Sequence, residues 1–304
     1  MPDVAVDAPA WTDRTVERPG VLLHVVDWGG SGPTLLLTHG ITAQAHVWDP
    51  VAMALRDRFR VLSLDQRGHG DSSNPPAGYA ATDFAADMAS VIDALADGPP
   101  LVMGHSLGGR NSLALAALHP GRIAGAVSVE FGPWISGDSF LRLRERVLAA
   151  PASFDSPEAA RAYLRARYSH LPADAIERRA RFGLRLTADQ RFVWKHERHG
   201  VAETLEFLEH DLTELILAIR IPVMMIHGAE SAFYDAPAYE KLQSARPDFL
   251  YREIPETDHY VHEERPATIA RLFLDFVDLA ARAPSPSFPP SPFPLPLARG
   301  EDSR

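Results

Sequence analysis

A serine between two glycines, in the pattern G-x-S-x-G, is the part of this chain best suited to chemistry. The pattern spans residues 104–108, with Ser106 at its centre. An apolar run of strand character, 100–103, precedes it, and residues 109–119 repeat apolar positions at helical spacing until Pro120. A strand, a tight turn and a helix in this order make a nucleophile elbow, which exposes the serine hydroxyl at the carboxyl edge of a sheet. We therefore predict that Ser106 is a nucleophile.

A histidine is needed to activate this serine, because a hydroxyl at its own pKa is a poor nucleophile. In enzymes with this elbow, the base comes after the nucleophile and the orienting acid along the chain. His259 lies late, just before the amphipathic segment 267–281 that closes the fold. His262 falls one turn further on, where we expect it to pack or to form a hydrogen bond. We predict that His259 is the base.

The acid that orients the histidine can be sought in two places. The commoner one follows the strand at 222–227, where an aspartate normally lies three residues past Gly228, and no aspartate stands there. The other is the end of the strand after the elbow's helix, where Glu130 ends an apolar run. A buried carboxylate is costly unless it is paired, and a histidine would pair it. We take Glu130 as the acid, keep Glu230 second and Asp235 third, and note that Glu130 could instead cap a loop.

Two backbone N–H groups must stabilise the negative charge that develops on the substrate oxygen. The residue after the nucleophile, Leu107, supplies one of them. We expect the other from Ile41, because it follows the buried strand 34–38 and because Gly40 lets the backbone turn inward. Since both donors are backbone groups, the side chains of these residues would shape the pocket and not its charge.

The elements that position these residues alternate between strands and helices, which is typical of an α/β fold with a mostly parallel twisted sheet and helices on both faces. The stretch 133–219 differs, because it lacks strand-like runs. We expect it to form a helical cap over the carboxyl edge of the sheet, where ligands bind in open α/β folds. Its helices are predicted at 138–149, 157–168, 173–182 and 202–218.

The chain therefore divides into three parts. Residues 1–132 and 220–282 are predicted to form the core, and residues 133–219 the cap, inserted after the sixth strand. Residues 283–304 form a tail. Seven of the thirteen residues at 284–296 are proline, which excludes a helix or a central strand and predicts a disordered or polyproline segment.

The composition argues against several classes of function. The chain has 304 residues, a formal net charge of −10 and no cysteine. The negative charge argues against nucleic acid as the main partner, and the lack of cysteine removes disulfides, thiolate metal sites and a cysteine nucleophile. No apolar run approaches the roughly 20 residues of a membrane span, and the first residues do not resemble a secretory signal. We expect a cytoplasmic protein without metal or cofactor.

Four motifs together resemble the α/β-hydrolase superfamily, across roughly residues 15–282. They are HGIT (39–42), DQRGHGDS (65–72), GHSLGGRNS (104–112) and DHYVHEERP (258–266). Other segments are similar to a narrower family, the serine amidohydrolases of vitamin B6 degradation, which cleave 2-(acetamidomethylene)succinate. These segments are Arg110-Asn111-Ser112, EFGPWI (130–135), RARYSHLPADAI (165–176) and GAES (228–231).

The narrower resemblance implies a triad of serine, an acid after the sixth strand, and histidine, which match Ser106, Glu130 and His259. That family has aspartate where this chain has Glu130, so the longer side chain must be accommodated. The broader resemblance separates this chain from epoxide hydrolases and dehalogenases of the same fold, because those enzymes have aspartate at the elbow.

The narrower resemblance also implies that arginines and a tyrosine of the cap hold the carboxylates of the substrate. The matching residues are Arg146, Arg167 and Tyr168. A guanidinium group can grip a carboxylate through two hydrogen bonds, and a tyrosine hydroxyl can add a third donor. Pairing at the protein surface is the alternative role for these arginines.

We predict a serine hydrolase that cleaves an amide or ester bond of a small, carboxylate-bearing substrate through an acyl-enzyme, a substrate of the 2-(acetamidomethylene)succinate type. A general carboxylesterase and a carbon–carbon bond hydrolase are the alternatives that use the same triad. A non-catalytic protein that binds a small ligand is a third, which the intact Ser106 and His259 argue against. The expected partner is an anionic small molecule, neither nucleic acid nor membrane, and the oligomeric state is left open, a homodimer included.

Overall fold

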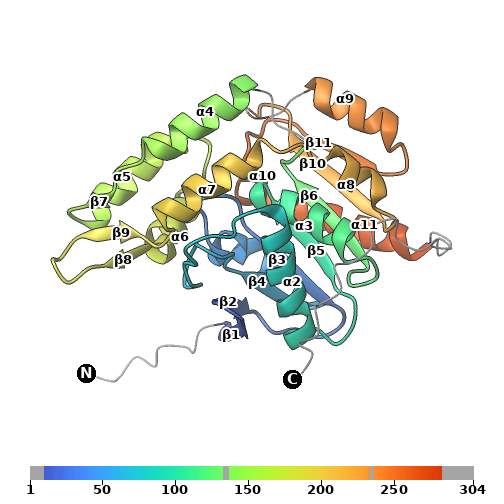
Figure 1. Ribbon diagram of the computed structural model, residues 1–304, viewed down its shortest axis with the longest axis horizontal. Coiled ribbons are helices and arrows are strands. Elements are labelled where there is room, and N and C mark those ends of the chain that lie inside the picture. Colours follow the sequence, from blue (N-terminus) through green and yellow to red (C-terminus); the bar gives the residue numbers. More distant parts are fainter. Residues whose placement is uncertain (1–9, 133–136, 232, 234–235, 283–304) are drawn as a thin grey trace, which may run out of the picture.

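The computed structural model describes residues 10–132, 137–231, 233 and 236–282. The predicted tail at 283–304 and the third acid candidate, Asp235, lie outside the described residues. The described part forms an α/β fold in which helices cover both faces of one large sheet, and a further group of helices lies at the upper left of Figure 1. This architecture confirms the predicted fold class.

The large sheet has eight strands in the order β1-β2-β4-β3-β5-β6-β10-β11. The two pairs at the β1 end are antiparallel, and all other neighbours are parallel. The strands β3, β5 and β6 are buried along their whole length, as expected where helices cover both faces of a parallel sheet. The bounds are Thr12–Arg18 (β1), Val21–Asp27 (β2), Thr34–Thr38 (β3), Arg60–Leu64 (β4), Leu101–His105 (β5), Gly125–Val129 (β6), Val223–Gly228 (β10) and Leu250–Ile254 (β11).

The register of the central strands determines where the candidate site residues meet. Thr38 of β3 lies opposite Gly104 of β5, and His105 of β5 lies opposite Val129 of β6. Val129 in turn lies opposite Ile226 of β10. The residues that follow these four strands therefore start side by side at the carboxyl edge of the sheet, where ligands bind in this class of fold.

The apolar core lies in two layers, one on each face of the sheet. Helices α2, α3, α8 and α9 pack on one face, and α1 and α11 pack on the other together with a 3₁₀ turn, η1. Among the residues that the structure describes, no helix combines the length and the apolar composition of a membrane span. The bounds are Ala45–Trp48 (η1), Asp49–Leu55 (α1), Ala81–Leu95 (α2), Leu107–Leu118 (α3), Thr213–Ala218 (α8), Ala236–Ala245 (α9), Val261–Glu264 (α10) and Pro266–Arg282 (α11).

The segment between β6 and β10 contains the helices expected for a cap and, contrary to the prediction, three short strands. These strands form a second sheet in the order β7-β9-β8. Each has only two or three residues, which is too short to produce an alternating pattern in the sequence. The bounds are Gly137–Leu148 (α4), Ser153–Phe154 (β7), Pro157–Arg167 (α5), Ala173–Gly183 (α6), Leu184–Leu186 (β8), Phe192–Trp194 (β9) and Arg198–Leu208 (α7).

The predicted helix at 202–218 is two helices, α7 and α8. The Asp211 carboxylate accepts the N–H of Thr213 at 2.7 Å, which begins a new helix after a break. Ile216 of α8 is fully buried in the cluster that α2 and α3 form with the sheet. We infer that α8 belongs with the core and that the cap, for which we keep α4 to α7, ends before it.

The close crossing of β3 and α3 gives a test of the fold. A Cβ atom added to Gly108 would lie 2.4 Å from the carbonyl oxygen of Thr38, which is backbone and cannot move aside. We expect Gly108→Ala to cost about 1–3 kcal/mol or more by overpacking, seen as a lower Tm in a thermal melt. Gly137→Ala is the matched control, because nothing lies within 4 Å of its added Cβ. Equal melting temperatures for both variants would contradict this packing.

Candidate active site

Ser106 lies at the sharp turn between β5 and α3 in a strained backbone conformation. Its φ and ψ are 51° and −114°, in a region that costs a non-glycine residue about 1–3 kcal/mol. The turn is held by its N–H, which donates to the carbonyl of Val129 at 2.8 Å. A Cβ atom on Gly104 would lie 2.2 Å from the carbonyl oxygen of Gly108, so the turn needs glycine there. The elbow that the sequence predicts is therefore present.

The side chains of His259 and Glu130 meet beside this turn. His259 Nδ1 lies 2.9 Å from Glu130 Oε2, and the two side chains are only 8% and 2% exposed. The carboxylate also accepts the N–H of Gly228 at 2.5 Å and the hydroxyl of Ser231 at 2.7 Å. Because the ionised carboxylate only accepts, Nδ1 carries the proton, and Nε2 is left as the basic nitrogen.

The other candidates for the orienting acid and the base, Glu230 and His262, lie away from the contact between Glu130 and His259. Glu230 is exposed, and its backbone N–H donates to the carbonyl of Thr257. The ring of His262 is fully buried and packs against the rings of Trp48 and His105, with centroids 4.4 and 4.2 Å away. This packing agrees with the structural role expected for His262. Of the described candidates, Glu130 is the acid in contact with His259.

Backbone strain gathers at this edge of the sheet. Five non-glycine residues of the described chain have a positive φ, and three of them belong to the site: Thr42, Ser106 and Glu130, with φ values of 62°, 51° and 61°. Such conformations persist where the surrounding structure over-determines them, and they cluster at functional sites. The sequence pattern pointed to the elbow alone and missed the other two.

The two predicted oxyanion donors lie on either side of the serine. Leu107 is the first residue of α3, so its N–H has no acceptor within the helix and points with the positive end of the helix dipole. The loop after β3 comes close from the other side, because a Cβ atom on Gly40 would lie 3.3 Å from the Cβ of Ser106. Ile41 follows directly in this loop. The placement is compatible with the donor role that we assign to both amides.

The loop 65–72 supports the segment that carries Ile41. The buried Asp65 carboxylate accepts the N–H of Ala45 at 2.6 Å, and His69 Nε2 accepts the N–H of Thr42 at 3.1 Å. Burial opposes ionisation of Asp65, but the hydrogen bond from His24, the charges of His39 and His24 and the hydrogen bond from the Asp71 N–H together outweigh it and lower the pKa of Asp65 to about 2. Burial lowers the pKa of His69 well below its usual value, which keeps the ring neutral and able to accept.

The three residues after the elbow's glycines, Arg110 to Ser112, join α3 to its surroundings. The buried Arg110 donates to the carbonyl of Phe207 on α7 at 2.6 Å, and burial lowers its pKa to about 10. Asn111 donates to the side chain of Gln66 at 2.7 Å, and Ser112 donates to a carbonyl within its own helix. These contacts are structural, and the one made by Arg110 ties the elbow helix to the cap.

Ser106 and His259 face a pocket whose other walls are mostly apolar, which we call the apolar pocket. The apolar side chains come from the residue after Glu130, from α4, from the end of α7 and from the loop before α9. They are Phe131, Leu143, Leu208 and Phe233. This lining would accept a small uncharged group bonded to the carbonyl that the serine attacks.

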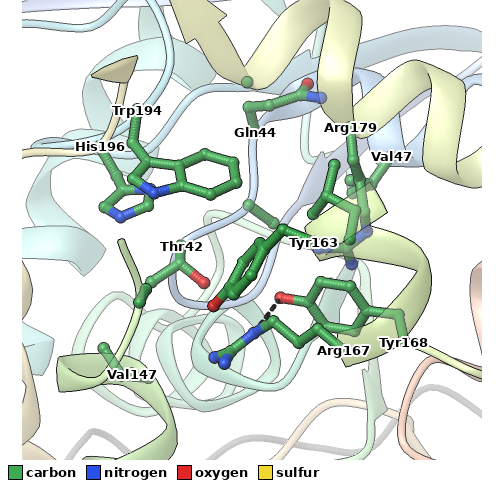
Figure 2. A pocket seen from close by; sticks show the side chains of 14 residues that line it. Thr42, Gln44, Val47, Val147, Tyr163, Arg167, Tyr168, Arg179, Trp194 and His196 are labelled. Atoms are coloured by element: carbon green, nitrogen blue, oxygen red, sulfur yellow. Dashed lines mark hydrogen bonds between the residues drawn. The ribbon is translucent and has the colours of Figure 1, made fainter. Parts of the chain in front are cut away.

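A second pocket, which we call the basic pocket, lies between the cap and the loop after β3 (Figure 2). Arg167, Tyr168 and Arg179 line it from the cap, and Thr42 lines it from the core. Figure 2 shows Trp194 and His196 stacked on the opposite wall. Charged and aromatic groups that converge in this way are typical of a site for an anionic ligand.

The two pockets lie on neighbouring residues of the same segments. Leu143 of the apolar pocket and Val147 of the basic pocket are one turn apart on α4. Tyr260, the residue after His259, packs against Tyr168 with the ring centroids 5.0 Å apart. The two pockets are therefore adjacent in the structure.

The three predicted substrate-binding residues form one cluster. Arg167 Nε donates to the hydroxyl of Tyr168 at 3.2 Å, and Arg146 donates to the backbone carbonyl of Arg167 at 2.9 Å. Both guanidinium groups lie over the Tyr168 ring. Burial raises the pKa of this tyrosine, but the charges of Arg179 and Arg167 outweigh burial and lower it. Arg167 and Tyr168 line the basic pocket, whereas Arg146 contacts them without lining it.

Arg179 is a site residue that the sequence reasoning missed. It lies on α6, is 6% exposed, and binds the buried Glu263 with two of its nitrogens. Its guanidinium group is 4.6 Å from the ring centre of Tyr168. The available signal was its spacing from Ala175 and Ile176, which places it on the buried face of the helix.

One group of possible metal ligands occurs among the described residues, namely His24, Asp65 and Asp71. Its members are already engaged: His24 bonds to Asp65, and Asp71 pairs with Lys195. We interpret this group as part of the scaffold of the 65–72 loop.

Comparison with known proteins identifies the family. The family described as alpha/beta hydrolase fold matches residues 33–266. The chain belongs to the α/β-hydrolase family. It is 36% identical over 278 residues to the 2-(acetamidomethylene)succinate hydrolase of Mesorhizobium japonicum, which covers 91% of this chain and 99% of that protein. The chain is accordingly a hydrolase.

A solved structure and a more distant relative extend this comparison. The crystal structure of E-2-(acetamidomethylene)succinate hydrolase matches this α/β-hydrolase with a TM-score of 0.85, over 88% of this chain and 99% of the other. Haloalkane dehalogenase 2 of Mycobacterium tuberculosis is 27% identical over 87% of this chain and 93% of its own length. The relatives thus include hydrolases that act on different bonds.

The contacts of Glu130 give a test of the triad. We expect Glu130→Gln to reduce kcat by about 10³–10⁴-fold, because the amide would no longer fix the tautomer of His259 or stabilise its protonated form. Glu230→Gln is the matched control and should leave kcat within about twofold, since an exposed surface change is usually neutral. Steady-state hydrolysis of an activated ester measures both. A larger loss in the Glu230 variant would move the acid to that residue.

Proposed function

We propose that this α/β-hydrolase cleaves the amide or ester bond of a small dicarboxylate through an acyl-enzyme at Ser106, with a 2-(acetamidomethylene)succinate-like molecule as its substrate. The observation that carries the proposal is a pair of cap arginines without acidic partners among the described residues, beside the Ser106–His259–Glu130 arrangement. The name of the 36%-identical relative indicates the same class of substrate.

In the proposed mechanism, Ser106 attacks the carbonyl carbon while His259 Nε2 removes the proton of the hydroxyl. The oxygen becomes negatively charged and is stabilised by the amides of Ile41 and Leu107. The protonated His259, held by Glu130, then gives its proton to the leaving nitrogen or oxygen, and the acyl-enzyme remains. Water activated by His259 attacks this ester, the acid is released, and the serine regains its proton.

Charge balance favours an anionic substrate. Arg179 is neutralised by Glu263, whereas neither Arg146 nor Arg167 pairs with a carboxylate in the part of the chain that the structure describes. Both of these side chains are only partly exposed, so their charges are poorly solvated without a partner. The guanidinium group of Arg167 in the basic pocket matches a carboxylate of a succinate derivative, and the positive charge of the neighbouring Arg146 adds to the attraction.

The two pockets suggest how such a substrate lies. The carboxylates would bind in the basic pocket, and the acyl group, which is acetyl in 2-(acetamidomethylene)succinate, would point into the apolar pocket between Phe131 and Leu143. The scissile carbonyl would then lie at Ser106, between the two. A group without charge or hydrogen-bonding atoms suits apolar walls, because no polar atom is left unpaired there.

A general carboxylesterase is the second candidate, and the apolar pocket favours it. An enzyme of this kind needs the triad and an apolar acyl site but not the cap arginines. The two functions therefore differ in whether Arg146 and Arg167 contribute to turnover.

A fluorophosphonate probe and a substrate comparison test the proposal. We expect the probe to label the native protein and to fail on Ser106→Ala, because the reagent needs an activated serine. Labelling that survives Ser106→Ala would contradict a serine mechanism. In a parallel assay, kcat/KM for an N-acetyl enamine dicarboxylate should exceed that for its diethyl ester. A preference for the neutral diester would favour the carboxylesterase.

Arginine variants test carboxylate recognition directly. Arg167→Ala should raise KM for the dicarboxylate about 10- to 100-fold, the range expected for losing a hydrogen bond to a charged group. The KM for a neutral acetate ester should change little. Arg165→Ala on the same helix is the matched control, because that side chain is exposed. Equal losses for the charged and neutral substrates would refute recognition by Arg167.

A further inference from the structure

Arg179 and Glu263 form a buried ion pair between the cap and the core. Arg179 lies on α6 of the cap and Glu263 on α10, next to the loop that carries His259. Nε of the arginine is 3.0 and 3.2 Å from the two carboxylate oxygens, and Nη2 also contacts Oε2. The side chains are 6% and 0% exposed. Such a bidentate contact fixes both the distance and the orientation of the two helices.

The same guanidinium group lies against two tyrosine rings. It is 4.6 Å from the ring centre of Tyr168 and 4.9 Å from that of Tyr260. The two rings meet edge to face at 89°. Figure 2 shows Arg179 beside Tyr168 in the wall of the basic pocket. One cation therefore holds a ring of the proposed carboxylate site together with a ring of the catalytic loop.

The contact continues to His259 through the backbone and through Tyr260. Tyr260 follows His259 directly, and their rings pack edge to face with centroids 5.1 Å apart. The backbone N–H of Glu263 donates to the carbonyl of Tyr260 at 2.8 Å. Glu263 therefore closes the turn that begins immediately after the histidine, and Arg179 holds that turn from the cap.

Arg179 already pairs with the carboxylate of Glu263. Arg146 and Arg167, in contrast, have no acidic partner among the described residues. We propose that the Arg179–Glu263 pair is a positioning element that keeps Tyr168 of the basic pocket and His259 of the triad in one alignment. Binding of the carboxylate and proton transfer then depend on the same cap–core contact. The proposal rests on the function proposed above for the site.

The double variant Arg179→Met/Glu263→Gln tests this role. It removes the ion pair without leaving an unpaired buried charge, which a single substitution would do. We expect kcat for a neutral acetate ester to fall about 10- to 100-fold, since a misplacement of a reacting group by about 1 Å has an effect of this size. KM for the dicarboxylate should rise about tenfold as well, because Tyr168 loses its support. Arg179→Lys keeps the charge and should recover part of both losses.

The matched control is Arg161→Met/Glu177→Gln, which removes an exposed ion pair between α5 and α6 of the same cap. It should change neither kcat nor KM. A folded Arg179/Glu263 double variant with wild-type kcat and KM would overturn the proposal, and a rise in KM alone would overturn the link to His259. If the double variant does not fold, Arg179→Lys decides, and wild-type constants for it would overturn the proposal too.

The assay with the neutral acetate ester distinguishes a failure of this proposal from a failure of the proposed function. An enzyme that hydrolyses the neutral ester but not the dicarboxylate amide would contradict the assigned substrate. The loss of ester kcat in the double variant would still report on the link between Arg179 and His259.

Discussion

The hydrogen bond between the Glu130 carboxylate and His259 is the interaction on which the rest of the site depends. It joins the end of β6 to the loop after β11, and three donors share the carboxylate: His259, Gly228 and Ser231. In the commoner arrangement the acid follows the strand that corresponds to β10. Here that strand end supplies Gly228 and Ser231 as donors to an acid on the neighbouring strand. These three donors satisfy the hydrogen-bonding capacity of a carboxylate that is buried from solvent.

The hydrogen-bonded strands of the sheet make this arrangement possible, because they hold the strained backbone of Ser106 and Glu130 in place. Ser106 and Glu130 both leave parallel strands with a positive φ, and the backbone N–H of each donates to a neighbouring strand: Ser106 to Val129, and Glu130 to Ile226. The paired strands hold these conformations, which a free loop would relax. The longer side chain of Glu130 reaches His259 at 2.9 Å from this position.

Much of this could be predicted from the sequence because the signals are local. The apolar strand runs, the elbow at Ser106 and the missing aspartate after Gly228 are each visible within a few residues, and together they favour Glu130 over Glu230 and Asp235. The strands β7 to β9 were missed because two- or three-residue strands have no periodicity. Arg179 was missed because its spacing from Ala175 and Ile176 indicates only a buried helix face, whereas its pairing depends on Glu263, a partner 84 residues away.

A buried ion pair is an unusual choice for joining two layers, because desolvation of both charges offsets most of their attraction. Apolar side chains would stabilise the contact at least as well, but they pack in several orientations. The bidentate contact between Arg179 and Glu263 has one geometry, and it forms only when α6 and α10 have one relative position. Such a contact contributes orientation more than free energy. That is what the proposed site needs, because its proposed binding groups lie in the cap and its proposed proton-transfer groups lie in the core.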